Sequence, residues 1–308
     1  MSDDNNDMIL CCASCGIAEI DDIKLMPCDD CDLVRYCSDE CREVHQSEHE
    51  EACKKRAAEL REELLFMQPE SSYLGDCPIC SLPLPLDPEK SRMQSCCSKV
   101  ICNGCFYANK EREIRGGLVQ LCPFCREPSP SSEEDKDKQR MKRIEANDPA
   151  AIYHEGGRHL MKGEYNRAFE YFAKAAALGD AGAHYQLSVM YRLGDGVEKD
   201  KGKEIHHLEE AAIAGHPSAR HNLGTAECDY ERTVKHWIIA AAQGHADSMK
   251  KLIKVFKVEQ GMMFMEKEEL AATLRAHKAA VDATKSPQRD KAEEIQRRVS
   301  ATNKLILL

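Results

Sequence analysis

Apolar residues recur at a helical spacing along the C-terminal half of the chain, from about Asp148 onward. Three such segments each end in the sequence Ala-Ala-x-x-Gly. Their glycines, Gly179, Gly215 and Gly244, lie 36 and 29 residues apart. A period near 35 residues with one large and several small apolar positions predicts stacked helical hairpins, because small residues let two helices approach closely. The glycines suit helix ends at which φ becomes positive. Large apolar residues that we expect in the core stand at fixed offsets from the glycines: Phe172, Leu208 and Trp237 before them, and Leu187, Leu223 and Leu252 after them.

These units resemble Sel-one-like repeats, which are relatives of the tetratricopeptide repeats. The second repeat matches the family sequence best, with Tyr191-Arg-Leu-Gly194-Asp-Gly196-Val197 and then Asp200 in the loop between its helices. The resemblance implies an all-α superhelical solenoid of helical hairpins over residues 148–261. Stacked hairpins present a concave groove, so we expect this region to bind a partner protein. Residues 262–308 are predicted to form capping helices, with Pro287 ending the first of them.

The N-terminal part is dominated by cysteine, since sixteen of the seventeen cysteines precede Glu127. Between Cys77 and Cys125, eight of them form four pairs. A segment this short buries too little apolar surface to fold alone, and two Cys-x-x-Cys turns can close one tetrahedral zinc site. In an interleaved order, one ion would be held by Cys77, Cys80, Cys102 and Cys105, and a second by Cys96, Cys97, Cys122 and Cys125.

The order of these pairs resembles a RING finger. A RING finger usually has a histidine among its eight ligands, but Lys99 stands in the comparable run of this chain, and a charged lysine cannot bind zinc. Either Cys96 and Cys97 both serve as ligands, or the second site is degraded. The resemblance implies a ubiquitin ligase in which three residues contact the ubiquitin-conjugating enzyme or its ubiquitin: Ile79 and Pro123 as an apolar shelf, which a helix over 103–115 completes, and Arg126 as a bridging cation.

A second cysteine-rich stretch precedes this one and resembles a MYND finger, through its Tyr36-Cys37-Ser38 step and its last ligands. Interleaving would give one ion to Cys12, Cys15, Cys37 and Cys41, and the other to Cys28, Cys31, His49 and Cys53. Gln46 stands where the family has a tryptophan, and Glu50 stands where it has a lysine, so recognition of proline-rich peptides is not expected. Cys11 could substitute for Cys12 as a ligand, but it is interpreted as a spare thiol because Cys12 has the spacing of a Cys-x-x-Cys turn. His45 is interpreted as a solvated helix residue.

Charge and composition narrow the cellular context. The N-terminus lacks the features of a signal peptide, no run is long enough to span a membrane, and the net charge is −10. We therefore expect reduced, zinc-bound thiols in an intracellular protein, cytoplasmic or nuclear, with neither nucleic acid nor membrane as a partner. The predicted organisation is an acidic tail (1–10), a MYND-like finger (11–56), a helical connector (57–75), a RING-like finger (76–128), a charged linker (129–147), the repeats (148–261) and the capping helices (262–308).

No catalytic constellation is apparent, and both zinc modules would fill all four positions on each of four expected zinc ions. A catalytic zinc keeps one position open, so hydrolysis at these ions is not expected. Two functions remain. The first is a RING-type ubiquitin ligase that recruits its substrate through the repeats. The second is a non-enzymatic scaffold that uses all three modules to assemble partners, which the missing histidine and tryptophan favour.

Overall fold

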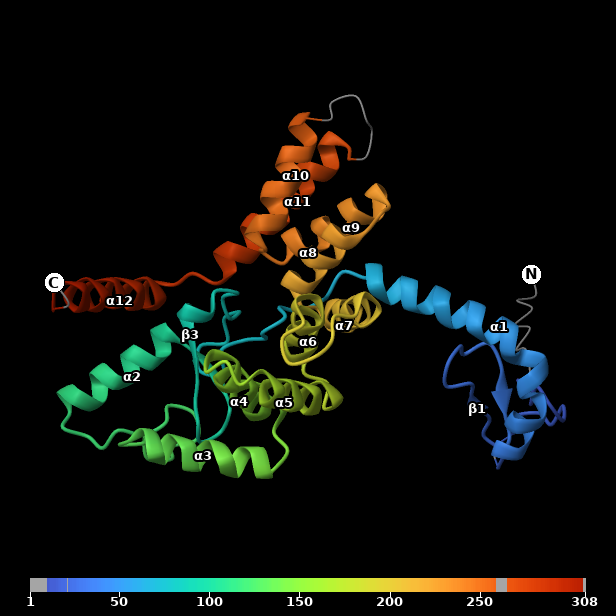
Figure 1. Cartoon of the computed structure of the whole chain (residues 1–308), viewed down its shortest axis with the longest axis horizontal. Coiled ribbons are helices and arrows are strands. Elements are labelled where there is room, and N and C mark those ends of the chain that lie inside the picture. The colour runs from blue at the N-terminus through green and yellow to red at the C-terminus, as the bar shows by residue number, and fades with distance from the viewer. Residues whose placement is uncertain (1–9, 21, 259–264, 307–308) are drawn as a thin grey trace, which may run out of the picture. The chain divides into compact units, whose positions relative to one another are not determined.

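The computed structural model describes residues 10–20, 22–258 and 265–306 and separates into two compact units, Met1–Met67 and Gln68–Leu308 (Figure 1). Twelve α-helices make up most of the described chain, and its strands form two short antiparallel pairs. This architecture confirms the predicted fold class, in which small cysteine-rich modules precede an all-α repeat region. Residues 1–9 of the predicted acidic tail lie outside the described residues.

The first unit is a small β-ribbon followed by one long helix. β1 (Met26–Pro27) pairs with β2 (Arg35–Tyr36), and α1 spans Asp39–Phe66. Ser38 caps α1, because its hydroxyl accepts a hydrogen bond from the backbone N–H of Cys41 at 3.3 Å. The helix runs through the last predicted zinc ligands into the connector, which is helical only as far as Phe66.

The second unit opens with the RING-like module. A short 3₁₀ helix, η1 (Pro88–Lys90), precedes the hairpin of β3 (Ser91–Met93) and β4 (Val100–Cys102), and α2 (Asn103–Arg115) follows directly. The Sγ atom of Cys102 caps α2 by accepting from the N–H of Cys105 at 3.5 Å. Only Leu84 and Ile101 are fully buried beside the cysteines of this core, so the module has little apolar surface with which to hold itself together.

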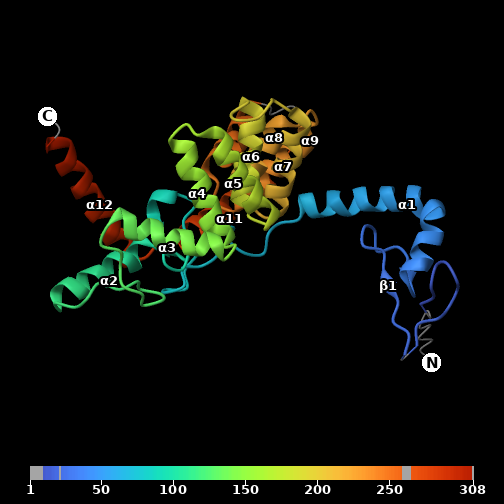
Figure 2. The same cartoon turned by 60° about the horizontal axis from the view of Figure 1, so that its bottom comes forward.

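The repeat region is a chain of short helices in which each helix packs on the next (Figure 2). Aspartates cap many of the helices by accepting hydrogen bonds from backbone N–H groups, for example Asp180 and Asp200. The helices are α4 (Pro149–Met161), α5 (Tyr165–Ala177), α6 (Ala181–Leu193), α7 (Lys201–Ile213), α8 (Pro217–Ala226), α9 (Tyr230–Ala242) and α10 (Ala246–Val258).

The repeat positions read from the sequence are confirmed. All six large apolar residues predicted to lie in the core are buried. Gly179, Gly215 and Gly244 each end a helix with φ near +84°, +86° and +91°, respectively. A side chain would be strained in that backbone conformation, which explains why glycine recurs at these helix ends.

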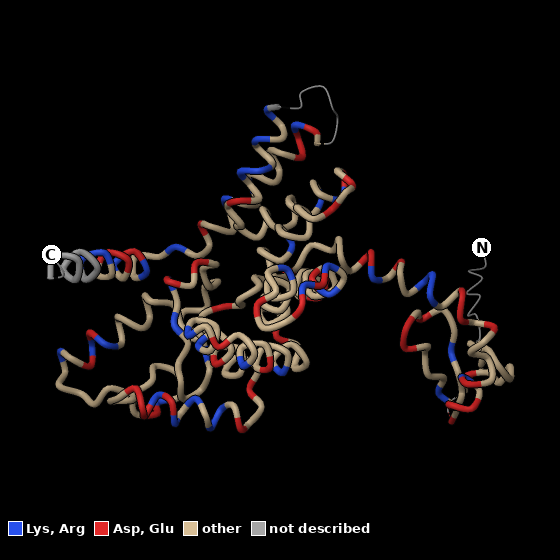
Figure 3. The backbone as a smooth tube through the Cα atoms, in the orientation of Figure 1, with Lys and Arg blue, Asp and Glu red and all other residues tan. Residues whose placement is uncertain are grey.

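The segment predicted to be a charged linker has a different structure from the one predicted. Residues 133–145 form α3 (Glu133–Glu145), which packs on α4. Ile144 enters the core of the first repeat, and Arg140 donates a hydrogen bond to the buried Glu155 at 2.6 Å. Charges of both signs lie along α3 (Figure 3), with acidic residues in its first turn and basic residues in its last turn, as the helix dipole favours. The segment is therefore an entry helix of the solenoid.

The two C-terminal helices have different roles. α11 (Lys267–Ala283) packs on α9 and α10, and its Leu270 joins the apolar cluster around Trp237, so this helix caps the repeats as predicted. α12 (Pro287–Ile306) does not cap the solenoid. It begins at Pro287 and packs along α2 of the RING-like module.

Replacing Trp237 by alanine should destabilise the repeat region by about 3–5 kcal/mol, since the indole is only 7 % exposed. Its Nε1–H also donates to the carbonyl of His221 at 3.3 Å. Urea unfolding followed by far-ultraviolet circular dichroism measures the loss. Met161→Ala is the matched control, because that side chain is 83 % exposed, and it should change stability by less than about 0.5 kcal/mol. Unchanged stability in Trp237→Ala would contradict a core position.

Candidate metal centres

The cysteines and one histidine of the two modules gather into four groups, and within each group the ligand atoms all lie within 4.8 Å of one another. Each group could hold one zinc ion, which agrees with the expected cofactor. The groups join the same residues that the interleaved order predicts, while the role of each residue as a ligand stays a prediction. The groups are Cys12, Cys15, Cys37 and Cys41; Cys28, Cys31, His49 and Cys53; Cys77, Cys80, Cys102 and Cys105; and Cys96, Cys97, Cys122 and Cys125.

The separations between sulfur atoms fit zinc and exclude disulfides. The Sγ atoms of Cys28 and Cys53 are 3.7 Å apart, and those of Cys80 and Cys102 are 3.9 Å apart. A tetrahedral ion with Zn–S bonds of about 2.3 Å places its sulfurs roughly 3.8 Å apart, whereas a disulfide needs about 2.05 Å. No disulfide joins any of the cysteines in the described residues.

Five tight turns present the paired cysteines, and each has the same backbone. The residue after the second cysteine adopts a left-handed conformation, with φ between +53° and +76°. In the Cys77 turn, the N–H of Ser81 donates to the carbonyl of Cys77, and the N–H of Cys77 donates to the carbonyl of Leu82. These bonds aim both thiols at one point. The left-handed residues are Gly16, Asp32, Ser81, Ser98 and Arg126.

The Cys96–Cys97 turn bears on the question that the missing histidine raised. Gln94 occupies the place that the first cysteine has in the other turns. Its N–H donates to the carbonyl of Lys99 at 2.9 Å, and its carbonyl accepts from Ser98 at 2.8 Å. Cys97 is thus the ordinary second cysteine of a turn, and Cys96 precedes it directly. Both thiols reach the group, since Cys96 lies 3.3 Å from Cys125 and Cys97 lies 4.0 Å from Cys122. This geometry favours two intact ligands over a degraded site.

The histidine of the first module is held by aromatic neighbours. The Nε2 atom of the buried His49 lies 3.1 Å from the Sγ of Cys31. His45 stacks on His49 at a centroid distance of 5.7 Å, and its Nδ1 lies 3.1 Å from the hydroxyl of Tyr36. The interpretation of His45 as a solvated residue is therefore wrong, because its side chain is only 20 % exposed and packs between Tyr36 and His49. Cys11 is exposed and lies outside the four groups.

The electrostatics of a thiol cluster favour a bound cation. The contact with Cys102 is the main cause that lowers the pKa of Cys77, to about 4, and the same contact raises the pKa of Cys102. Burial raises the pKa of Cys97 to about 11 and that of Cys105 to about 12. One thiolate thus suppresses the ionisation of its neighbours, and a divalent ion removes that conflict by allowing all four to ionise.

The three residues expected to contact a conjugating enzyme lie on the turns of the RING-like module. Ile79 is 43 % exposed, Pro123 is half-buried, and Arg126 is exposed. The sequence interpretation missed Phe124, which is 42 % exposed beside Pro123 and lies 6.0 Å from the Nζ of Lys99. An exposed aromatic residue inside a Cys-x-x-Cys turn was the feature that could have identified it.

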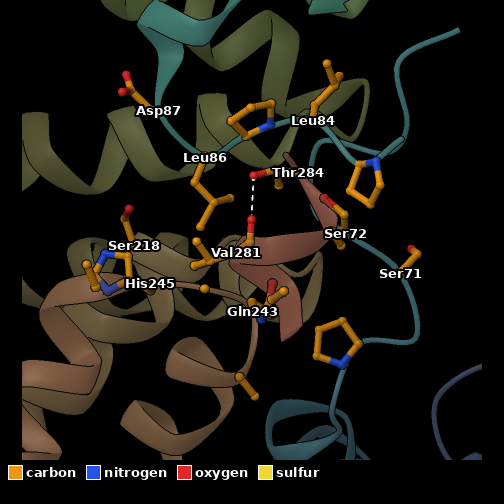
Figure 4. A pocket seen from close by; sticks show the side chains of 18 of the residues that line it. Ser71, Ser72, Leu84, Leu86, Asp87, Ser218, Gln243, His245, Val281 and Thr284 are labelled. Carbon is orange, nitrogen blue, oxygen red and sulfur yellow. Dashed lines mark hydrogen bonds between the residues drawn. The ribbon is translucent and has the colours of Figure 1, made fainter. Parts of the chain in front are cut away.

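A cavity of about 690 Å³ lies elsewhere in the second unit (Figure 4). Its walls come from the loop Pro83–Asp87, from the end of the third repeat around His245, and from the end of α11 around Val281 and Thr284. No cysteine lines it, so it is distinct from the zinc groups. Among the described residues that line the cavity, no serine or cysteine is hydrogen-bonded to a base that could activate it as a nucleophile.

Comparison with known proteins identifies two of the three modules. A family model described as MYND finger matches residues 12–53, and one described as Sel1 repeat matches residues 150–180, 181–216 and 220–245. The chain therefore carries a MYND finger followed by Sel1 repeats. None of the helices among the described residues has the length and apolar composition that crossing a membrane requires.

Two solved structures are similar to part of this chain. A Sel1 repeat protein from Oxalobacter formigenes is 24% identical with a TM-score of 0.43, over 56% of this chain and 71% of that chain. A protective antigen present in uropathogenic Escherichia coli strains, displaying an SLR fold, is 19% identical with a TM-score of 0.39. That match covers 54% of this chain and 37% of the antigen.

Purified protein should contain four zinc ions per chain by elemental analysis, and a value of three would contradict the assignment of Cys96 and Cys97. Structural zinc contributes roughly 10 kcal/mol or more of folding free energy per site. Chelation should therefore unfold residues 12–125, while the repeats keep their helical circular dichroism. Loss of both together would contradict separate folding of the repeats.

Acid should destabilise the repeats through their buried histidines. Burial, with the charges of Arg220 and Arg232, lowers the pKa of His236 to about 3, and burial lowers the pKa of His216 and His245 to about 4. Below pH 6.5 the unfolded chain takes up protons that the folded chain refuses, so stability falls as the pH drops from about 6.5 toward 4. Each such histidine contributes a slope of about 1.4 kcal/mol per pH unit.

The single tryptophan makes this test specific, because Trp237 reports unfolding of the repeats and not of the zinc modules. Urea midpoints from its fluorescence at pH 7 and pH 5 give the slope. His236→Gln should reduce the slope, and His206→Gln, at an exposed position, should leave it unchanged. Equal slopes in all three proteins would contradict the role of His236.

Proposed function

We propose that the chain is a RING-type ubiquitin ligase that recruits its substrate through the Sel1 repeats. At the coarser level, the chain is a zinc-binding protein with protein-interaction repeats. The finer part rests on the module between Cys77 and Cys125. Two interleaved cysteine groups there hold three turns, a hairpin and α2 in one body, which is the arrangement a RING ligase uses to present a rigid surface.

The observation that carries the proposal is the exposed apolar surface of the zinc turns. Ile79 on the first turn is accompanied by Pro123 and Phe124 on the last turn. Their own module does not need these side chains for its core, which consists of Leu84, Ile101 and the cysteines. Exposed apolar side chains on a rigid scaffold fit the centre of a protein interface, where a few anchors supply most of the binding energy.

Such a ligase forms no covalent bond with ubiquitin. It binds a conjugating enzyme charged with ubiquitin and holds the thioester in a reactive pose, so its contribution is orientation. Arg126 follows the last cysteine and is exposed, so its planar guanidinium can donate to carbonyl groups of both bound proteins. Zinc, when bound, supplies rigidity, because each group already offers four ligands and leaves no position for substrate.

The repeats and the MYND finger would bind the substrate protein. A solenoid of helical hairpins offers a concave groove for a peptide or a folded partner. The MYND finger has the exposed Gln46 in place of an aromatic side chain, so we do not propose that it binds proline-rich peptides. We infer an intracellular protein, cytoplasmic or nuclear, because clustered zinc-binding thiols suit a reducing compartment.

The alternative is a non-enzymatic scaffold, and one contact favours it. α12 packs along α2, the helix that should complete the surface for the conjugating enzyme. If α12 covers the part of α2 that such an enzyme needs, the module cannot bind one while the helix stays docked. In that case all three modules would serve only to assemble partners.

Ile79→Ala should abolish self-ubiquitylation in an assay with a panel of conjugating enzymes, because truncating a central anchor costs about 2 kcal/mol or more of binding free energy. Zinc content should remain at the wild-type value, since Ile79 is not a ligand. Val119→Ala removes an apolar side chain that is 73 % exposed in the same module, and it should keep full activity. Activity that is indifferent to Ile79, or absent from the fully metallated wild type, would favour the scaffold.

Arg126→Ala should separate binding from transfer. The variant should bind the conjugating enzyme nearly as well as the wild type but discharge its ubiquitin more slowly, because the guanidinium acts only on the closed pose. Single-turnover discharge measured beside a binding isotherm distinguishes the two steps. A parallel loss in both measurements would contradict the bridging role.

A further inference from the structure

One arginine of α12 reaches into the RING-like module. Arg289 lies in the first turn of α12 and is only 6 % exposed. Its Nη1 donates hydrogen bonds to the carbonyls of Pro83 at 2.6 Å and Thr284 at 2.7 Å. Its Nη2 donates to the carbonyl of Leu82 at 3.1 Å and to the Sγ of Cys80 at 3.5 Å. Three of these four acceptors lie more than 200 residues earlier in the chain.

The backbone of α2 is shaped for this approach. A Cβ atom placed on Gly104 would lie 3.0 Å from the Cγ and from the backbone nitrogen of Arg289, tighter than most real Cβ contacts, so the helices would have to shift by a few tenths of an ångström. Glycine at this position, between Asn103 and Cys105, therefore lets α12 approach closely. Further along the two helices, Lys291 pairs with Glu111 at 2.8 Å. The docking of α12 is thus specific in both position and direction.

The charge of the zinc group explains why a buried cation is placed here. Four thiolates around one Zn²⁺ carry a net charge of −2, and burying uncompensated charge is costly. Three of the four cysteines in the Cys77 group are buried. The group with His49 is also largely buried but contains a neutral ligand, and the two other all-cysteine groups each contain an exposed cysteine. The Cys77 group therefore has the greatest need for a positive neighbour.

We propose that Arg289 is an outer-sphere partner of the zinc ion held by Cys77, Cys80, Cys102 and Cys105, so that zinc retention at this site and docking of α12 stabilise each other. The N–H···S bond stabilises the Cys80 thiolate, and the guanidinium charge offsets the tetrathiolate. Because two linked equilibria act reciprocally, undocking α12 weakens zinc binding by the same factor by which losing zinc weakens docking. This linkage does not depend on whether the module transfers ubiquitin.

The same guanidinium joins two walls of the cavity in Figure 4. Pro83 and Thr284 both line that cavity, and the Nη1 of Arg289 bonds the carbonyls of both. One wall belongs to the RING-like module, and the other belongs to the end of α11. Zinc at the Cys77 group thereby holds the module against the capped end of the repeats.

Arg289→Leu tests the linkage in the full chain, with Lys291→Gln as the control that removes a docking contact of α12 away from the sulfurs. Zinc release to a chromogenic chelator should show one of the four ions leaving about 10- to 100-fold faster in Arg289→Leu, the range typical for loss of an outer-sphere partner. Mass spectrometry of alkylated protein should show Cys77 and Cys80 becoming reactive at the rate at which that zinc ion leaves. Hydrogen exchange should show lost protection in residues 287–298. Lys291→Gln should keep the wild-type release rate.

Arg289→Lys distinguishes charge from hydrogen-bond geometry, because lysine keeps the charge but lacks the planar fork. We expect a zinc release rate between those of the wild type and Arg289→Leu. If Arg289→Leu fails to fold, comparing the release rates of Arg289→Lys and Lys291→Gln still tests the proposal. An unchanged release rate in the Arg289 variants would overturn the proposal. Equal acceleration in Lys291→Gln would also overturn it, since that variant loses only an exposed ion pair and keeps the contact between Arg289 and Cys80.

Discussion

Coordination of zinc by clustered thiolates is the interaction on which the N-terminal half of this protein depends. Neither module has a core that could replace it, since the buried apolar side chains beside the cysteines are Leu25 and Tyr36 in one and Leu84 and Ile101 in the other. The backbone turns are built to serve the metal, with a left-handed residue after each second cysteine. The exposed apolar side chains of the turns, including Ile79 and Phe124, are positioned by the same backbone.

The repeats are stabilised in the opposite way. Each helix packs mainly on its neighbours in sequence, so the region needs no metal and tolerates a unit of different length. Small residues at the contacts allow close packing, and one large side chain in each repeat fills the remaining space. The two halves therefore respond to different stresses, the first to chelators and oxidants and the second to urea and acid.

Sequence reasoning succeeded where the determining contacts are local. The spacing of Cys77 and Cys80, or of Gly179 and Leu187, reflects one turn or one hairpin, and the structure brings the expected residues together. It did less well where partners are distant. The placement of α3 depends on Arg140 meeting Glu155 and Ile144 entering a core, and composition alone suggested a solvated linker. Arg289 could not have been found at all, because three of its four acceptors are backbone carbonyls, which carry no sequence pattern, and the fourth, the Sγ of Cys80, lies 209 residues away. The Gln94 turn shows a third case, in which a backbone shape persists after its usual residue has been replaced.

The contact between α12 and the RING-like module also imposes an order in time. Arg289 follows Cys125 by 164 residues, so at about 5–20 residues per second the ribosome completes the module roughly 10–30 seconds before it makes the arginine. During that interval the carbonyls of Leu82 and Pro83 and the thiolate of Cys80 lack their buried donor. Zinc bound during that interval is therefore held without the contact that Arg289 later supplies. A chain that stops short of α12 would remain in that state permanently.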